Sequence, residues 1–134
     1  MTDRMPSIHP IVRYRDVRAG MEFLVRAFGF EAHEVHEGPD GELAHVELRH
    51  DNGIVMLSGE TASRDEFAGE AGRSWVYVVV EDADAHHDRA QAAGAEIVTE
   101  PISTDYGSRD YSARDIDGNL WSFGTYRPSP AGSA

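Results

Sequence analysis

Two halves of this 134-residue chain repeat the same order of structural signals. In each half an apolar run precedes an aspartate suited to a helix N-cap, then a helical segment and a glycine that ends it. Three further apolar runs follow, and a turn containing glycine joins the last two. Asp16 matches Asp82 at a spacing of 82 − 16 = 66, and Gly53 matches Gly118 at 118 − 53 = 65. The nearly constant spacing predicts an internal duplication.

Each repeat is predicted to form a βαβββ module whose open sheet face needs cover. Two such modules can curl their sheets around one shared cleft, with the helices outside. We therefore expect one α+β domain over residues 1–134. Its parts are expected to be module one at about 8–58, a linker or flap over the cleft at 59–72, module two at about 74–126 and a tail at 127–134. Helices are expected near 17–28 and 83–93, and strands at 8–14, 30–37, 42–49, 54–58, 75–80, 95–99, 111–114 and 120–126, with 101–108 as a loop.

Composition limits the classes of partner. The formal charge of −12 makes nucleic acid and anionic membranes poor partners. No apolar run is long enough to cross a bilayer, and the N-terminal residues show no apolar core of a secretory signal. The absence of cysteine excludes disulfides, thiolate metal sites and cysteine nucleophiles, and it fits a cytoplasmic location.

The hairpin that closes the second repeat is the most specific stretch of the sequence. Its turn runs from Asp115 to Asn119 and contains Gly118, which supplies the positive φ of a tight turn. The strand after the turn alternates, so Trp121 and Phe123 are expected to face the core. The opposite face is small and polar and is expected to line a cavity; it consists of Leu120, Ser122, Gly124 and Tyr126.

This hairpin resembles the closing hairpin of the vicinal oxygen chelate superfamily. That superfamily holds glyoxalase I, bleomycin-resistance proteins, fosfomycin-resistance enzymes and extradiol dioxygenases. Its members end in a D-P-x-G-N-x-[IWY]-x-[FL] hairpin, which stands here at Asp115 to Phe123 with Ile116 in place of proline. The resemblance covers roughly Ile8 to Tyr126 and implies paired βαβββ modules, often assembled as a homodimer.

The resemblance also implies where a divalent metal would bind. The four ligand positions of the family fall on His9, Met56, Trp75 and Ser122. Only the imidazole is a good ligand, because a thioether, an indole and a serine hydroxyl are poor donors to hard or borderline metals. The chain therefore looks most similar to the metal-free, bleomycin-resistance-like branch, with no cofactor.

A displaced metal site is the alternative. His45 and Glu47 lie two apart on the expected third strand and therefore share a face. If that face is the cleft, His9, His45 and Glu47 could hold a divalent metal in a glyoxalase-like lyase, isomerase or dioxygenase. The other interpretation is that His45 and Glu47 are polar residues facing the cavity or solvent. The adjacent His86 and His87 are expected on different faces of a helix, both in solvent.

The remaining residues of the cleft suit a flat or aromatic organic ligand, although they could instead fill the groove or pack against a dimer partner. We expect a metal-free protein that sequesters an aromatic or cationic small molecule in the cleft between the modules, as a homodimer that covers the sheet edges. A cofactor-free enzyme, or a protein with a closed cleft, is left open, although the spacing places no nucleophile beside a base. The expected ligand-binding residues are His9, His45, Glu47, Met56, Trp75, Tyr77, Tyr111, Ser122 and Tyr126.

Overall fold

A computed structural model describes residues 6–59 and 70–130 of the chain. The expected linker therefore lies largely outside the described residues, as do parts of the two termini. The elements are β1 (Ile11–Tyr14), α1 (Val17–Phe28), β2 (Glu31–Glu37), β3 (Leu43–His50), β4 (Gly53–Gly59), β5 (Trp75–Val79), α2 (Ala83–Ala92), β6 (Glu96–Ser103), β7 (Arg109–Arg114) and β8 (Leu120–Gly124). Neither helix in these residues combines the length and the apolar character needed to cross a bilayer.

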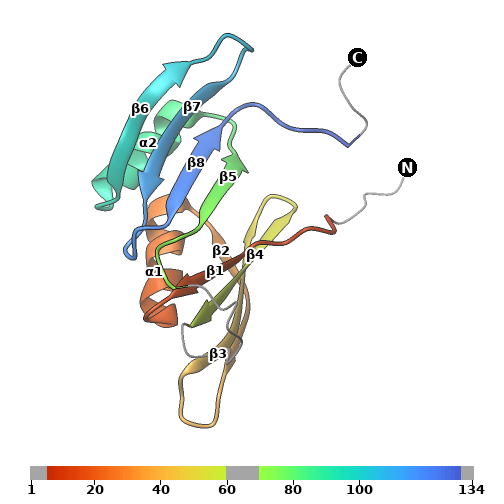
Figure 1. The fold of residues 1–134 in the computed structure, drawn as a ribbon, viewed down its shortest axis with the longest axis vertical. Helices are drawn as coiled ribbons and strands as arrows, with labels where there is room; N and C mark the ends of the chain where they lie inside the picture. The colour runs from red at the N-terminus through yellow and green to blue at the C-terminus, as the bar shows by residue number, and fades with distance from the viewer. Residues whose placement is uncertain (1–5, 60–69, 131–134) are drawn as a thin grey trace.

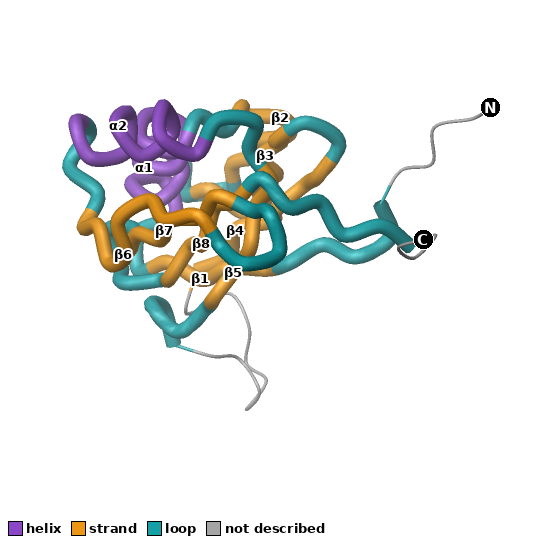
Figure 2. The backbone as a smooth tube through the Cα atoms, turned by 90° about the horizontal axis from the view of Figure 1, so that it is seen from above, coloured by secondary structure: helices purple, strands orange, loops and turns teal. Residues whose placement is uncertain are grey.

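The strands form two four-stranded sheets with the same topology. The first has the order β1-β4-β3-β2 and the second β5-β8-β7-β6. In each sheet the first and last strands of the module pair in parallel, and the other pairs are antiparallel. Figure 1 shows the second module above the first, and Figure 2 shows α1 and α2 together on one side. The predicted α+β fold of two βαβββ modules is confirmed.

The helices begin at the two aspartates that define the repeat. The Asp16 carboxylate accepts a hydrogen bond from Ala19 N at 3.1 Å, and the Asp82 carboxylate accepts one from Ala85 N at 3.0 Å. Gly29 ends α1 in the left-handed conformation, with φ of 78°. The caps fix where each helix starts, so the sequence predicted both starts correctly.

Three local expectations need correction. β1 begins at Ile11, because Pro10 has no N–H to donate to a neighbouring strand. β6 continues through Pro101 to Ser103, where a loop was expected; β6 is an edge strand, and an edge tolerates a missing N–H. The first hairpin takes its positive φ at Asp51 (53°), and Gly53 already belongs to β4.

One apolar core lies between the helices and the inner faces of both sheets. Phe28 at the end of α1 packs against Phe123 of the second sheet, with 4.8 Å between ring centroids, and against Trp121 at 5.8 Å. Trp121 and Phe123 are fully buried, as the alternation of β8 predicted. The first helix therefore helps to cover the sheet of the other module.

A buried carboxylate joins the two modules. Asp115, 7% exposed, accepts hydrogen bonds from five groups: Tyr14 Oη at 2.5 Å, Trp121 Nε1 at 2.9 Å, and Asp117 N, Asn119 N and Asn119 Nδ2. Tyr14 belongs to β1 and the other donors belong to the closing hairpin. Burial, followed by the nearby Asp115 charge, raises the pKa of Tyr14, so the phenol stays protonated and remains the donor.

The neighbouring Asn119 ties the same hairpin to two further segments. It is fully buried, its Oδ1 accepts from Ser74 N at 3.0 Å, and its Nδ2 lies 3.4 Å from Arg13 O. The aspartate and asparagine of the family-like hairpin therefore act as structural acceptors and donors between the modules.

A second contact joins the modules at the equivalent turn of the first repeat. His50, at the end of β3, donates from Nε2 to the carbonyl oxygen of Val79 at the end of β5, over 2.7 Å. His50 and Asp115 occupy matching places in the two copies, at a spacing of 115 − 50 = 65. In each repeat, a residue at the end of the third strand or directly after it therefore contacts the first strand of the other repeat.

The histidines of α2 are not in solvent, contrary to expectation. His86 Nε2 donates to Phe28 O at 2.8 Å, so Nδ1 must accept from Tyr111 Oη, at 2.5 Å. His87 is 8% exposed, and its ring meets the edge of Tyr111. Burial lowers the pKa of His86, which favours the neutral ring that these two bonds require. The expectation failed because α2 lays both histidines against α1 and the second sheet.

Replacing Asp115 by asparagine should destabilise the protein by about 2–4 kcal/mol, because the amide NH₂ would face N–H donors in a buried place. Urea unfolding at pH 7.5 measures this change. Glu31→Gln is the matched control, because Glu31 pairs with Arg49 in solvent and exposed pairs contribute at most about 1 kcal/mol. Equal stability of the two variants would contradict the structural role of Asp115.

Candidate functional site

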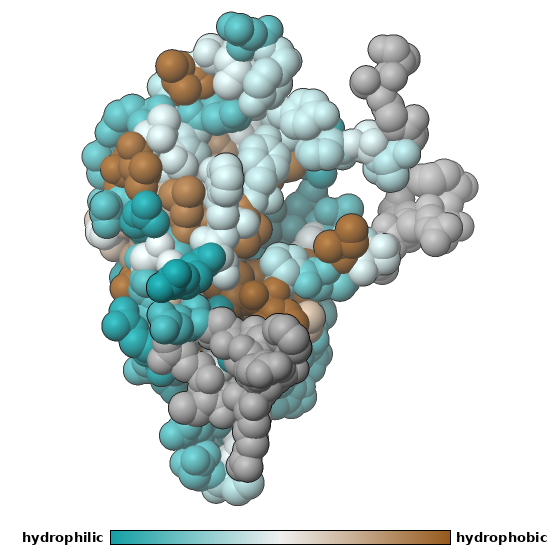
Figure 3. All heavy atoms as spheres, viewed as in Figure 1, coloured by the Kyte–Doolittle hydropathy of each residue, from teal (hydrophilic) through white to brown (hydrophobic). Residues whose placement is uncertain are grey.

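The open face of the second sheet, opposite the helices, carries a broad hollow of about 610 Å³. Five of its residues are large hydrophobic side chains that are exposed in the monomer, with Trp75 at 74% and Tyr106 at 66%. The surface in Figure 3 shows hydrophobic residues over this module and along the boundary between modules. The lining residues are Trp75, Tyr77, Val98, Thr99, Ile102, Thr104, Tyr106, Asp110, Tyr111, Ser112, Leu120 and Ser122.

The alternation of side chains along the strands identifies the residues that form the floor of the hollow. Tyr77 of β5 pairs with Ser122 of β8, which in turn pairs with Ser112 of β7, so these residues share one face. Trp75 lies two residues before Tyr77 on the same face, and its indole Nε1 donates to Ser122 Oγ over 2.8 Å. This hydrogen bond holds the indole across the sheet while leaving most of the ring exposed.

Polar and aromatic groups meet at the other end of the hollow. Tyr77 Oη donates to the carbonyl oxygen of Tyr126 at 2.6 Å, and burial raises the pKa of Tyr77. The rings of Tyr106 and Tyr126 meet edge to face at 5.8 Å. Tyr106 Oη donates to Asp110 Oδ2 at 3.2 Å, and Ser108 Oγ donates to Asp110 Oδ1.

The structure brings only part of the predicted site together. Trp75, Tyr77 and Ser122 line the hollow, and Tyr126 borders it through Tyr106. Four predicted residues of the first module do not line this hollow: His9, His45, Glu47 and Met56.

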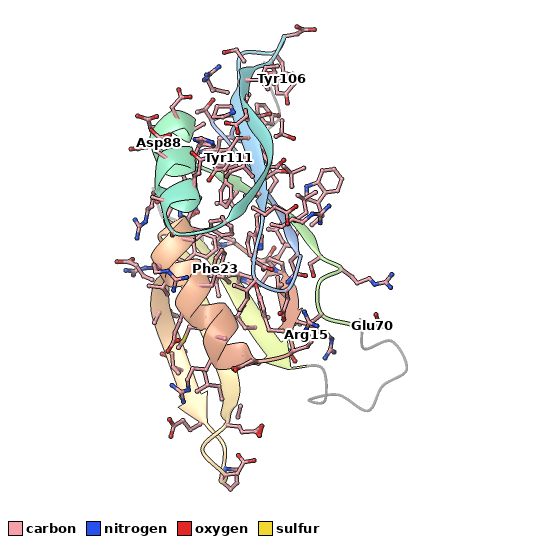
Figure 4. All side chains as sticks on the ribbon, turned by 90° about the vertical axis from the view of Figure 1, so that its left-hand side faces the viewer. Arg15, Phe23, Glu70, Asp88, Tyr106 and Tyr111 are labelled. Atoms are coloured by element: carbon pink, nitrogen blue, oxygen red, sulfur yellow. The ribbon has the colours of Figure 1, made fainter. Side chains whose placement is uncertain are left out.

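Tyr111 requires a correction. Its side chain is 1% exposed and stacks on Phe123, with 5.2 Å between ring centroids. In Figure 4 it lies between the second sheet and α2, whereas Tyr106 lies at the far end of the β6–β7 connection. Tyr111 is thus among the residues around the hollow, but it alternates with Asp110 and Ser112 on β7, so its side chain points to the helices and the core.

The predicted residues of the first sheet have their own geometry. Met56 pairs with Glu47 of β3 and with Ile11 of β1, on the open face. His45 Nε2 and Glu47 Oε2 are 2.7 Å apart, and this hydrogen bond lowers the pKa of Glu47. The ring nitrogens of His9 face backbone carbonyls, Nδ1 at 3.2 Å from Ile54 O and Nε2 at 3.0 Å from Pro6 O.

A smaller hollow of about 190 Å³ lies between the modules. Ile8, Pro10 and Ile54 contribute from the first module, and Val76 and Tyr77 from the second. Tyr77 is thus common to the broad hollow and to this narrow one. The narrow hollow is too small for a drug-sized ligand, since pockets for such ligands measure roughly 300–1,000 Å³.

The residues at the four family ligand positions do not fit a divalent metal. The indole of Trp75 has no lone pair to offer, and its N–H is directed at Ser122 Oγ, the next position of the set. Among the described residues, no group of three histidine, aspartate or glutamate side chains is placed to hold a metal ion. The alternative set is therefore not assembled here: His45 contacts Glu47, while His9 contacts backbone carbonyls.

Sequence reasoning missed several residues of the hollow. Val98 and Ile102 lie on β6, part of which was expected to be a loop, and Tyr106 lies in the connection that follows. Asp110 precedes the stretch expected as a strand. The pairing of Ser112 with Ser122 would have shown that Asp110, and not Tyr111, faces the hollow. That pairing can be derived only when the register of the hairpin is known.

Comparison with known proteins gives a consistent result. The family described as the Glyoxalase/Bleomycin resistance protein/Dioxygenase superfamily matches residues 7–123. Protein Mb0911c of Mycobacterium bovis is 30% identical over 127 residues, which cover 89% of this chain and 82% of that protein.

Solved structures are similar over nearly the whole chain. TioX from Micromonospora sp. ML1 has a TM-score of 0.80 at 31% identity, covering 94% of this chain and 100% of TioX. TnmS3, described as an antibiotic binding protein from Streptomyces sp. CB03234, has a TM-score of 0.70 at 20% identity, covering 90% and 93%. At that identity the second similarity concerns the fold alone.

The donor set predicts that zinc or nickel is not retained stoichiometrically. After dialysis of metal-loaded protein against buffer, elemental analysis should find far less than one ion per chain. Trp75→His should not change this result, because His9 and one added imidazole still fall short of a complete ligand set. One ion per chain in the wild type, lost in His9→Ala, would contradict the prediction and favour the set of His9, His45 and Glu47.

Proposed function

This chain belongs to the Glyoxalase/Bleomycin resistance protein/Dioxygenase superfamily, and on that premise we propose that it binds an aromatic small molecule without a metal. The proposed site is the hollow of about 610 Å³ on the open face of the second sheet, in place of the cleft between the modules that the sequence predicted, where the hollow measures about 190 Å³. The proposed role is sequestration, as in the bleomycin-resistance type, and the proposed location is the cytoplasm.

The exposed indole of Trp75 is the observation that carries the proposal. A side chain of this size is normally buried, and a large exposed apolar patch marks a place where something binds. The hydrogen bond to Ser122 fixes the ring, so little side-chain entropy is lost when a flat molecule stacks on it. Stacking contributes about 0.5–1.5 kcal/mol beyond the burial of area.

The composition of the hollow supports a ligand of moderate size. Its volume of about 610 Å³ falls within the roughly 300–1,000 Å³ typical of small-molecule sites. Aromatic and aliphatic side chains alternate with a few hydroxyl groups, the usual mixture in such sites. TnmS3 has the same fold and is described as an antibiotic binding protein, so the fold is compatible with this class of ligand.

We further propose that a second copy of the chain covers the hollow. β1 and β2 end the first sheet and β5 and β6 end the second, so four edges carry unpaired backbone groups within the described residues. An isologous homodimer would bury these edges or the exposed apolar residues, and it would close the open side of the ligand site.

Replacing Trp75 by alanine should weaken the binding of a planar probe such as acridine about two- to twelvefold, the loss expected from one stacking contact. Isothermal titration calorimetry at pH 8 measures the dissociation constant. Ile116→Ala is the matched control, because Ile116 is an exposed apolar residue that does not line the hollow. Wild-type affinity in Trp75→Ala would place the ligand elsewhere.

Light scattering tests the assembly. The expected mass is twice the 14.8 kDa of one chain at micromolar concentration. A second copy would shield Trp75, so its fluorescence should be less accessible to an aqueous quencher at high protein concentration than after dilution. A mass near that of one chain at high micromolar concentration would contradict the homodimer.

A further inference from the structure

We infer that Asp110 selects a ligand that carries a positive charge beside its aromatic rings. This inference rests on the proposed function, since it concerns what the same hollow accepts. The expected ligand is a planar aromatic cation rather than any flat molecule.

The charged groups around the hollow favour a cationic ligand. Of the described residues that line it, Asp110 is the one with a formal charge at pH 7; the others are apolar, hydroxyl-bearing or aromatic. The chain has no lysine, so no long flexible ammonium group is available to neutralise this carboxylate. A ligand that fills the hollow therefore meets a single negative charge.

The two arginines of β7, which also contains Asp110, interact with other groups. Arg109 alternates to the helix side of β7, and its guanidinium pairs with Asp84 of α2 at 3.1 Å. Arg114 donates to the carbonyl oxygen of Gly118 at 2.9 Å. Among the described residues no basic side chain forms an ion pair with Asp110, so its charge is left for a ligand.

The carboxylate is held in place and keeps acceptor capacity. Ser108 Oγ donates to Oδ1 and Tyr106 Oη donates to Oδ2, so two of about four lone-pair positions are used. Neither donor is charged, and the two bonds orient the group without neutralising it. A cationic N–H group, or a quaternary nitrogen nearby, can therefore still interact with Asp110.

The residue opposite Asp110 on the neighbouring strand, Gly124, leaves room for the carboxylate. Gly124 pairs with Asp110, and a Cβ at position 124 would overlap the carboxylate and come within 2.7 Å of Tyr77 Oη. The φ of Gly124 is not positive, so the glycine is needed here for room and not for backbone freedom. Gly124 thus allows the carboxylate and the phenol to lie side by side over the sheet.

The rings near Asp110 favour the same class of ligand. Tyr106 and Tyr126 pack edge to face beside the carboxylate. A cation close to the face of an aromatic ring is attracted by the ring electrons, and the attraction is stronger when water is excluded. A carboxylate and aromatic faces at one end, with an indole at the other, match a planar molecule whose charge lies at one side.

The experiment compares two probes of nearly the same shape, neutral acridine and the permanent cation N-methylacridinium, by calorimetry at pH 8. The wild type should bind the cation about three- to tenfold more tightly, and the preference should shrink as sodium chloride is raised. Asp110→Asn should lose the preference while keeping the affinity for acridine. Glu42→Gln is the control, because it removes one exposed negative charge far from the hollow.

The outcomes separate this inference from the proposed function. Equal affinity of the wild type for the two probes, or an unchanged preference in Asp110→Asn, would overturn the role of Asp110 while leaving the binding site intact. A preference that falls equally in Glu42→Gln would assign it to the net charge of the protein and would also overturn the inference. Failure of both probes to bind would count against the proposed site itself. The salt dependence of the wild type provides a test even if Asp110→Asn is unstable.

Discussion

The hydrogen bonds to the Asp115 carboxylate hold the two halves of this protein in one arrangement. A carboxylate removed from water is costly unless several donors replace the solvent, and here five donors converge on it. One of them, the Tyr14 hydroxyl, comes from a strand 101 residues earlier in the chain. Because the hydrogen-bonding geometry is directional, this contact sets the position of the first strand against the closing hairpin.

In the part of the chain that the structure describes, one face of each sheet has no covering layer of helices or strands. The inner faces of both sheets pack against the helices, and Phe28 of the first module packs on Phe123 of the second. Within residues 6–59 and 70–130, no element covers the outer face of the second sheet, and its large side chains are exposed, Trp75 most of all. The proposed ligand site is a consequence of how the modules are joined, since each module uses its helix side for the core.

The polar side chains on the open face of the second sheet already form hydrogen bonds with one another. At positions where the superfamily places metal ligands, Trp75 and Ser122 bond to each other. The carboxylate of Asp110 is oriented by a serine and a tyrosine, without a histidine or arginine. These pairings support the proposal that the site recognises a ligand by stacking and charge.

Sequence reasoning reached the fold because its signals are local. Asp16 and Asp82 mark helix starts wherever their segments lie, and the alternation around Trp121 identifies a core face without knowledge of the neighbours. The site depended on register. Tyr111 and Asp110 are adjacent, and which of them faces the hollow is set by how β7 pairs with β8 across a five-residue turn. The burial of His86 depended on contact with α1, which no local pattern reports.

The matching turns of the two modules make opposite kinds of hydrogen bond to the other module. His50 donates a hydrogen bond to the first strand of module two, whereas Asp115, at the matching place, accepts one from the first strand of module one. Two copies of module one would set a histidine beside Tyr14, and two copies of module two would set a buried carboxylate beside Val80, which offers no side-chain donor. The two contacts are therefore no longer equivalent: a histidine donor meets a backbone carbonyl at one turn, and a carboxylate acceptor meets a phenol at the other, so each turn is matched to the first strand of the other half.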